Sequence, residues 1–314
     1  MTRVLVFGGA HLDRRGRISG QTVPGASNPG SWHEEAGGGG FNAARNLARL
    51  GHEVTMISPR GGDAEGEAVA LAAEAAGVND RPFVFLDRRT PTYTAIIEND
   101  GNLVIALADM DLYALFSPRR LAIRTVREAL SDAELIITDA NLPAETIAAL
   151  GRTARGLGKP IAGIGISPAK VVRFRPSLQN FDFIFMNEAE AAALAGTARP
   201  ADWRDWPRIL KDTGLAAGAI TRGGAEVIAW RGEDSAWLAP PPIDRIGDVT
   251  GAGDGFAAGF LHAISEGGGL TVALQAGVAS ARLALKSEKA TAENLTRELL
   301  AETLALVPEP EFVL

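Results

Sequence analysis

The stretch GDVTGAGDGFAAGFLHAI, residues 247–264, holds the strongest local pattern in the chain. Its apolar residues, Phe256 and Phe260 among them, recur at helical spacing and predict a helix. In front of them, the small residues 250–253 leave successive backbone N–H groups uncovered at the positive end of that helix, which favours an anion site. Asp254 lies among these donors. Either it caps the helix, or it handles a proton or a metal beside the anion, and the flanking Gly-Ala-Gly favours the second interpretation.

Outside this stretch, short apolar runs alternate with amphipathic segments rich in alanine and leucine. The runs predict strands at 4–9, 54–58, 135–138, 160–166, 181–186, 216–221 and 227–230. The amphipathic segments predict helices at 41–50, 65–76, 118–131, 144–155, 188–195, 254–266 and 270–286. Strands that alternate with helices indicate βαβ units, and therefore an α/β fold with a largely parallel sheet.

Two segments interrupt this alternation. Residues 14–36 are polar and rich in Gly, Ser and Pro, and residues 90–108 are typical of a β-hairpin with its turn at Asp100-Gly101. The hairpin is too apolar to stand alone in water, so we expect it to cover a site or to pair with a second subunit. We interpret 14–36 and 88–108 as a small β lid; an ordinary edge hairpin is the alternative.

Composition excludes several classes of protein. The chain has 314 residues, of which 46% are hydrophobic and 22% charged, as in ordinary soluble domains. A net charge of -7 without basic runs argues against a nucleic-acid partner. The absence of cysteine excludes disulfides, thiolate metal sites and a cysteine nucleophile. The N-terminal MTRVLVFGGAHLD resembles neither a signal peptide nor a membrane span, so we expect a cytoplasmic protein.

A second glycine-rich stretch, AGGGGFNAARNLARLG at 36–51, places four glycines before Asn42 and a helix. Such a run costs backbone entropy, and close approach of a ligand to the backbone would explain it. Asn42 can donate to and accept from a hydroxyl, and Asp13, just after the first strand, can accept from two. Ligands of open α/β sheets lie at the carboxyl ends of the strands. The alternative is a capping Asn42 and a solvated Asp13.

Two further motifs each allow a structural and a functional interpretation. Asn187-x-x-Glu190 is a capping-box pattern. The same pair could hold Mg²⁺ through water, because Mg²⁺ keeps several waters and few direct protein ligands. Thr221-Arg222-Gly223-Gly224 lies between two strand-like runs, where it predicts a hairpin turn that also borders a nucleotide.

Several familiar motifs are missing from the sequence. It has no P-loop, no protein-kinase set and no nucleophile elbow, and the histidines at 11, 33, 52 and 262 lack metal-ligand spacing. A dinucleotide-binding oxidoreductase would need G-x-G-x-x-G after the first strand, where this chain reads GGAHLD.

Taken together, these residues resemble the ribokinase (PfkB-type) family of sugar and nucleoside kinases along nearly the whole chain. GGGGFNAARNLARLG is similar to the family's N-terminal signature, DVTGAGDGFAAGF to its C-terminal signature, and NEAE at 187–190 to its N-x-x-E motif. The resemblance implies a single domain over 1–314 with a ribokinase-like three-layer α/β/α fold, a mostly parallel central sheet and a small β lid.

The resemblance also implies a role for each candidate residue. Asp254 would be the base that deprotonates the attacking sugar hydroxyl. The transferring phosphoryl group would lie on the backbone N–H groups of Gly251, Ala252 and Gly253. The sugar would bind at Asp13, Gly38, Gly39 and Asn42. ATP would lie against Asn187, Thr221, Gly223, Gly224 and Thr250. Mg²⁺ would be held through water by Asn187 and Glu190, and in many members Asp248 helps to bind K⁺.

Within the family, several stretches resemble pseudouridine kinases: SNPG (27–30), TPTYTAIIENDGNLVIALADMDLY (90–113), ITDANLP (137–143) and ISPAK (166–170). Gly39 and Phe41 depart from that subgroup's usual residues, and we expect both in the sugar pocket.

The implied activity is ATP-dependent phosphorylation of a primary hydroxyl on a ribosyl sugar or nucleoside, with pseudouridine as the leading acceptor. Ribose, fructose and 2-keto-3-deoxygluconate are alternative acceptors, and a non-catalytic sugar-nucleotide sensor on the same fold is the alternative class. We expect a homodimer joined through the lid, with Tyr93 or Ile96 reaching the acceptor.

Overall fold

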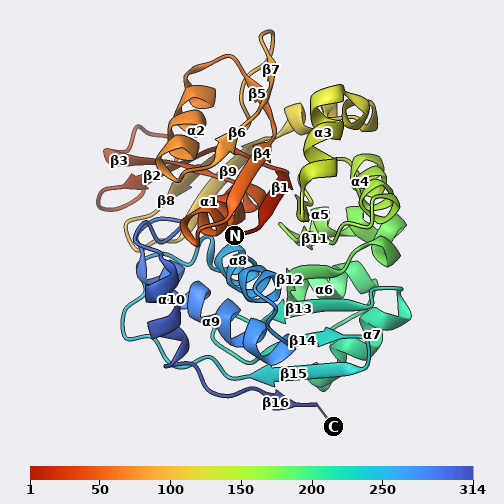
Figure 1. The fold of residues 1–314 in the computed structure, drawn as a ribbon. Coiled ribbons are helices and arrows are strands. Elements are labelled where there is room, and N and C mark those ends of the chain that lie inside the picture. Colours follow the sequence, from red (N-terminus) through yellow and green to blue (C-terminus); the bar gives the residue numbers. More distant parts are fainter. Residues whose placement is uncertain (314) are drawn as a thin grey trace.

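The central element of the computed structural model, which describes residues 1–313, is a ten-stranded sheet (Figure 1). Its strand order is β16 (Glu311–Phe312), β15 (Asp234–Leu238), β14 (Val227–Arg231), β13 (Ala217–Thr221), β12 (Phe183–Asn187), β11 (Ile161–Ile164), β10 (Leu135–Asp139), β1 (Arg3–Phe7), β4 (Glu53–Ile57) and β6 (Asn79–Asp80). In this order, the strands from β13 through β10 and β1 to β6 are parallel to one another. The strands β14, β15 and β16 extend the β13 edge with antiparallel pairs. The sheet is therefore mostly parallel, as the alternating pattern predicts.

Helices cover both faces of the sheet and give the three-layer arrangement. One face carries α1 (Gly39–Arg49), α2 (Ala64–Ala75), α8 (Ala252–Ser265), α9 (Leu270–Lys286) and α10 (Arg297–Leu304). The other carries α3 (Arg124–Asp132), α4 (Ala144–Gly156), α5 (Pro168–Val171), α6 (Glu188–Ala195) and α7 (Trp206–Asp212). Each face has its own apolar core, and on the α8 side Phe183 and Phe185 pack edge-on against Phe260.

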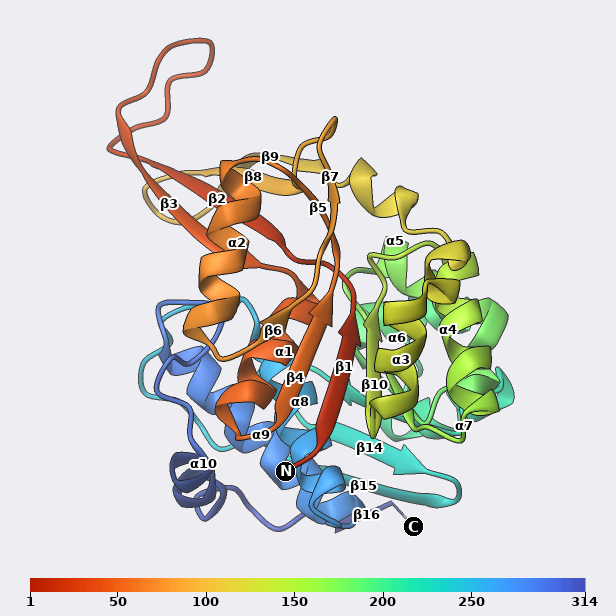
Figure 2. The same ribbon diagram turned by 45° about the horizontal axis from the view of Figure 1, so that its top comes forward.

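A second sheet forms what we call the lid sheet. Its order is β3 (Gly30–Gly37), β2 (His11–Ile18), β8 (Thr92–Ile97) and β9 (Leu103–Asp109). The predicted hairpin over 90–108 is confirmed, because β8 pairs antiparallel with β9 and Gly101 takes the left-handed backbone that its turn needs. In Figure 2 the β2–β3 hairpin extends outward from the body of the molecule.

The structure differs from the expected elements at several places. The helix predicted over 118–131 is two elements, a 3₁₀ helix η2 (Pro118–Ala122) and α3, because Ile123 between them has an extended backbone. The sequence pattern did not predict several short elements. These are β15, β16, α5, α7, α10, the β5 (Pro59–Gly61) and β7 (Phe83–Phe85) pair, and the 3₁₀ helices η1 (Asp111–Leu115), η3 (Val172–Asn180) and η4 (Trp203–Asp205). Among residues 1–313, no helix combines the length and the apolar character needed to cross a bilayer.

Candidate active site

The N-terminus of α8 lies where the sequence places its anion site. Gly251 is the N-cap and has the left-handed backbone (φ 75°), and a Cβ at this position would collide with the carbonyl oxygen of Ala290. Only glycine fits there without strain. Gly251 rather than Asp254 therefore occupies the cap position, and the cap-only interpretation of Asp254 is wrong.

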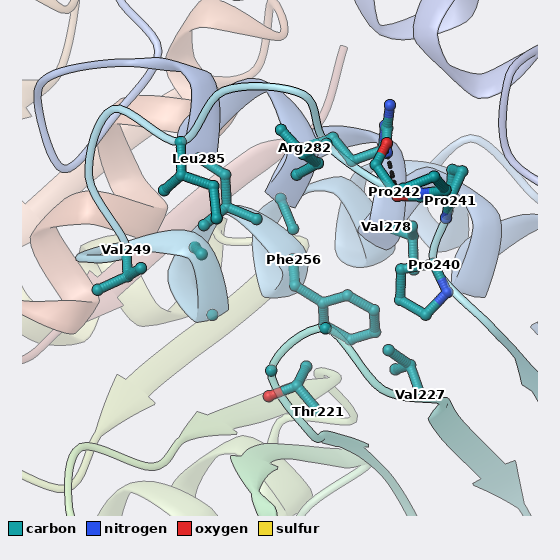
Figure 3. A pocket seen from close by; sticks show the side chains of 17 residues that line it. Thr221, Val227, Pro240, Pro241, Pro242, Val249, Phe256, Val278, Arg282 and Leu285 are labelled. Carbon is teal, nitrogen blue, oxygen red and sulfur yellow. Dashed lines mark hydrogen bonds between the residues drawn. The ribbon is translucent and has the colours of Figure 1, made fainter.

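A cavity of about 320 Å³ opens beside this helix start (Figure 3). Its lining joins two distant parts of the chain that the sequence assigns to one ligand: Thr221, Gly223 and Gly224 on one side, Ala252 and Gly253 on the other. Apolar side chains, including those of Val227, Ile246 and Phe256, cover much of the remaining wall. A cavity with an apolar wall at one end and bare helix N–H groups at the other suits a molecule that has a flat base and phosphates.

Arg282 shapes the rim of this cavity. Its guanidinium donates hydrogen bonds to the carbonyl oxygens of Pro241 and Pro242, as Figure 3 shows, and so ties α9 to the proline-rich wall. The turn at 221–226 is the expected hairpin, with β13 antiparallel to β14. Arg222 there is held by Glu188 (Nε to Oε1, 3.3 Å) and Glu226 (Nη1 to Oε2, 2.8 Å).

Asp254 lies between this cavity and the glycine-rich start of α1. Its Oδ2 accepts a hydrogen bond from Asn42 Nδ2 at 2.8 Å, so two residues 212 positions apart meet at the site. Burial raises the pKa of Asp254 to about 7, with the Asn42 hydrogen bond opposing the rise and the charges of Asp139 and Glu190 adding to it. A carboxyl group with such a pKa can accept a proton near neutral pH and release it again.

The glycines before Asn42 bring α1 close to this carboxylate. A Cβ on Gly39 would collide with Ile166 Cδ1 and lie 3.2 Å from Asp254 Oδ1, and a Cβ on Gly38, whose φ is 112°, would collide with the carbonyl oxygen of Gly9. The glycine run therefore allows tight packing of backbone against the site. Phe41 is fully buried in the core, so the expectation that it lines the sugar pocket is wrong. Successive residues of a helix point about 100° apart, so Phe41 faces the core while Asn42 faces Asp254.

The remaining sugar-side candidates lie on the lid sheet. Asp13 pairs with His11 (Oδ1 to Nε2, 3.3 Å) and faces Tyr93 across the parallel β2–β8 ladder. Because side chains alternate along a strand, Ile96 points to the opposite face of the lid sheet, where it lies beside Gly16 and Trp32. The structure therefore brings Tyr93, and not Ile96, to the face that holds Asp13.

Sequence reasoning missed Asp139, the buried last residue of β10. Its carboxylate accepts from the backbone N–H of Gly9 (2.8 Å), of Gly40 (2.9 Å) and of Asn141 (2.9 Å). It thereby fastens the end of β1 to the start of α1. An aspartate at the carboxyl end of a mostly apolar strand, inside ITDANLP, was the available signal.

Asn187 and Glu190 form the capping box that their spacing predicts. The Asn187 N–H donates to Glu190 Oε2 and the Glu190 N–H donates to Asn187 Oδ1, both at 2.9 Å. Burial raises the pKa of Glu190, and the Asn187 hydrogen bond only partly offsets this. A Cβ on Gly165 would lie 2.6 Å from Glu190 Oε2, so the glycine leaves room for the carboxylate.

Asp248 is linked to the lid sheet, a connection that the sequence did not reveal. Its carboxylate pairs with Arg15 of β2 and accepts from the N–H and hydroxyl of Thr250, each at 2.9 Å. Burial alone would raise the pKa of Asp248, but Arg15 and Thr250 lower it on balance. The lid sheet and the loop before α8 are therefore joined by an ion pair.

Two histidines without recognisable spacing in the sequence meet at the far end of the sheet. His52 Nε2 lies 2.8 Å from His262 Nδ1, with Glu266 nearby. The Thr2 N–H donates to His52 Nδ1 (3.3 Å), so the proton of neutral His52 is on Nε2 and faces His262. This arrangement leaves His52 Nε2 no lone pair for a metal.

Comparison with known proteins identifies the family of this chain. A model of the pfkB family of carbohydrate kinases matches residues 1–297. The chain belongs to this family. The pseudouridine kinase of Escherichia coli (strain K12) is 26% identical over 318 aligned residues, which cover 98% of this chain and 97% of that protein.

Solved structures of carbohydrate kinases agree with this assignment. A carbohydrate kinase from Agrobacterium tumefaciens is 57% identical over the full length of both chains, with a TM-score of 0.91. Ribokinase of Arabidopsis thaliana, solved with ribose and ATP, shares the fold at 20% identity, with a TM-score of 0.84 over 96% of this chain and 98% of that one. This pfkB chain is thus an ATP-dependent kinase with the ribokinase-like fold that its two signatures predict.

Proposed function

We propose that this kinase phosphorylates the primary hydroxyl of a ribosyl nucleoside or sugar, with pseudouridine as the leading acceptor. The observation behind this proposal is the position of Asp254. It lies between the cavity, whose lining runs from Thr221 to Leu285, and the Asp13 and Asn42 side of the site, and its pKa is about 7. A base with a nucleotide cavity on one side and hydroxyl-binding groups on the other suits phosphoryl transfer to an alcohol.

In this reaction Asp254 accepts the proton of the attacking hydroxyl. The hydroxyl oxygen forms its bond to the γ-phosphorus of ATP while the bond to the leaving ADP oxygen breaks. The N–H groups of Gly251, Ala252 and Gly253 hold the phosphoryl oxygens at the positive end of α8, a 14-residue helix. Asp13, Gly38, Gly39 and Asn42 hold the acceptor, and Thr221, Gly223, Gly224 and Thr250 border ATP.

The donor set near the phosphate position fits Mg²⁺. Asn187 and Glu190 would organise the ion through its waters, since the capping box uses one carboxylate oxygen of the buried Glu190. When bound, Mg²⁺ neutralises phosphate charge. A monovalent cation at Asp248 would share the carboxylate with Arg15, which already supplies one positive charge.

Two observations support a nucleoside as acceptor. Pseudouridine kinase is among the relatives that align over nearly the whole chain. Tyr93 lies on the same face of the lid sheet as Asp13, where its ring could lie against a nucleobase. Free ribose would offer that ring only hydroxyl groups.

An acceptor screen tests the proposal. ADP release would be measured with pseudouridine, uridine, ribose, fructose and 2-keto-3-deoxygluconate, with K⁺ or Na⁺ as the salt. We expect the highest kcat/KM with pseudouridine and a product phosphorylated at the primary hydroxyl. A higher kcat/KM for free ribose would overturn the nucleoside assignment, and binding without turnover of any acceptor would favour the sensor.

We also propose that two copies associate through the lid sheet. Strand β9 is an edge strand whose apolar side chains are exposed, with Ile105 65% and Leu107 70% exposed. An edge of this kind is a template for pairing with another strand. Light scattering should show a dimer for the wild type and a monomer for Ile105→Asp/Leu107→Asp; a monomeric wild type would refute the dimer.

A further inference from the structure

Arg45 is a buried arginine one helical turn after Asn42 in α1. Only 5% of the residue is exposed, although arginine is almost never buried unless it has partners. Its Nη2 donates to Asn42 Oδ1 at 2.6 Å and to the carbonyl oxygen of Ala36 at 2.8 Å. Its guanidinium also lies 4.8 Å from the centre of the Phe41 ring. These contacts give Arg45 a fixed position behind the site rather than within it.

The chemistry of the guanidinium decides how Asn42 is oriented. A guanidinium can only donate hydrogen bonds, so the amide oxygen of Asn42 must face Arg45. The amide nitrogen must then face Asp254, as the 2.8 Å contact has it. Without Arg45 the amide could rotate and present its oxygen to Asp254, which would stabilise the protonated carboxylic acid as donor. That form of Asp254 is unable to accept a proton.

Charge acts in the same direction as this geometry. The charged groups acting on Asp254 are Asp139 from β10, Glu190 from α6 and Arg45 from α1, and of these only Arg45 favours the ionised carboxylate. Burial lowers the pKa of Arg45 to about 10, opposed by the nearby charge of Glu35, so its charge persists at pH 7. Glu35 of β3 lies 3.8 Å from Arg45 Nη2, and both its oxygens accept from the Ala290 N–H.

We propose that Arg45 is a positioning residue for phosphoryl transfer, which holds the Asn42 amide with its nitrogen toward Asp254 and so keeps that carboxylate ready to accept a proton. The inference rests on the proposed role of Asp254 as the base. It concerns a residue that need not touch acceptor or ATP, and its signature is therefore a change in proton transfer rather than in binding.

The test compares Arg45→Met with the wild type, Arg45→Lys, Asn42→Ala and Asp254→Asn. Arg49→Met is the matched control, because Arg49 lies one turn further along α1 and donates to Thr291 Oγ1, away from Asn42. The dependence of kcat on pH would be measured with the acceptor that gives the highest rate in the screen above. The free energy of unfolding would be measured against pH for the same proteins, which needs no acceptor.

For Arg45→Met we expect the acid limb of the profile to move up by about one pH unit, and kcat at pH 7 to fall about 5-fold as a result. KM for ATP should stay unchanged, Arg45→Lys should recover part of the rate, and Arg49→Met should match the wild type. Asn42→Ala should move the acid limb the same way. Arg45→Met/Asn42→Ala should move it no further than Arg45→Met alone, because the loss of Arg45 already removes both its charge and the orientation of the Asn42 amide.

The outcomes separate this inference from the proposed function. If Asp254→Asn is inactive but Arg45→Met keeps the wild-type kcat and acid limb, Arg45 has no positioning role and the base assignment stands. If Asp254→Asn is fully active, the base assignment fails, and the inference with it. If Arg45→Met folds poorly, Asn42→Ala is the deciding variant. The inference is overturned if the acid limb of kcat against pH in Asn42→Ala coincides with that of the wild type. If the screen finds no acceptor, the pH dependence of the free energy of unfolding is the deciding measurement. The inference is overturned if the part of this dependence that Asp254 causes is the same with and without Arg45.

Discussion

Replacing Asp254 with asparagine tests the base with the smallest change of shape. Arg45 holds the Asn42 amide so that its nitrogen faces position 254. Asparagine there accepts this hydrogen bond through its carbonyl oxygen and points its own NH₂ toward the place of Oδ1, close to Gly39. The variant therefore keeps the volume and the Asn42 contact but puts a donor where the hydroxyl proton needs an acceptor.

The size of the effect follows from proton transfer. A positioned general base contributes ~10²–10⁴ in rate, so kcat should fall by that factor while KM for ATP changes little. In the wild type a pKa of about 7 leaves roughly one tenth of the base ionised at pH 6 and roughly nine tenths at pH 8. The wild-type kcat should therefore rise through this range and level off above it.

Asp254→Asn should lower the activity of the enzyme but raise its stability near and above neutral pH. The pKa of Asp254 is about 7 in the folded protein against a reference value of 3.8, so as pH rises the unfolded chain releases this proton at a lower pH than the folded protein does. The wild type therefore loses stability relative to Asp254→Asn as pH rises from about 4 to 7, and the variant should be the more stable protein above pH 7.

The assay measures ADP release from about pH 5.5 to 9, together with urea unfolding of both proteins at each pH. Full activity in a folded Asp254→Asn enzyme would refute the role of Asp254 in proton transfer. A wild-type kcat that is constant between pH 6 and 8 would show that a different group, or a different step, controls the rate.

Four further changes test other parts of the site. Gly39→Ala should lower kcat ~10–10²-fold, because its Cβ would collide with Ile166 Cδ1 and displace Asp254, and adding Ile166→Val should restore part of the rate; an unimpaired Gly39→Ala would contradict the close packing. Glu190→Gln should keep its cap and its melting temperature while raising the Mg²⁺ concentration for half-maximal rate, and an unchanged Mg²⁺ dependence would count against the metal role. Arg15→Gln removes the lid-to-loop ion pair, so KM for the acceptor should rise and the dependence on K⁺ over Na⁺ should steepen; equal salt responses in both proteins would exclude a cation at Asp248. Burial lowers the pKa of His52 to about 4 and that of His262 as well, so the free energy of unfolding should decrease as pH falls from about 6.5 to 4, and His52→Gln/His262→Gln should flatten this slope if the pair causes it.

Much of the scaffold could be predicted because it depends on local order. The strands β1, β4 and β10 are each marked by a short apolar run, and the helices α1, α4 and α9 by the helical spacing of their own apolar residues. The elements β16 and α5 contain too few residues for an apolar run or a helical period to show, and α10 has only about two helical turns. Ile96 was misplaced for a related reason, since its face of the strand depends on which strand pairs with it.

The sequence by itself determined the family, the three-layer α/β arrangement and the helix start with its small residues and Asp254. The signatures and the helix start are properties of single segments, and the α/β arrangement follows from the order in which strand-like and helix-like segments alternate.

Only the tertiary structure decided which groups act on Asp254. Asn42 reaches it across 212 residues, Arg15 reaches Asp248 across 233, and Asp139 fastens Gly40 from 99 residues away. Burial and the electric field at a carboxylate depend on distance in space, so the pKa of about 7 and the orientation imposed by Arg45 arise only when β10, α1, α6 and α8 come together.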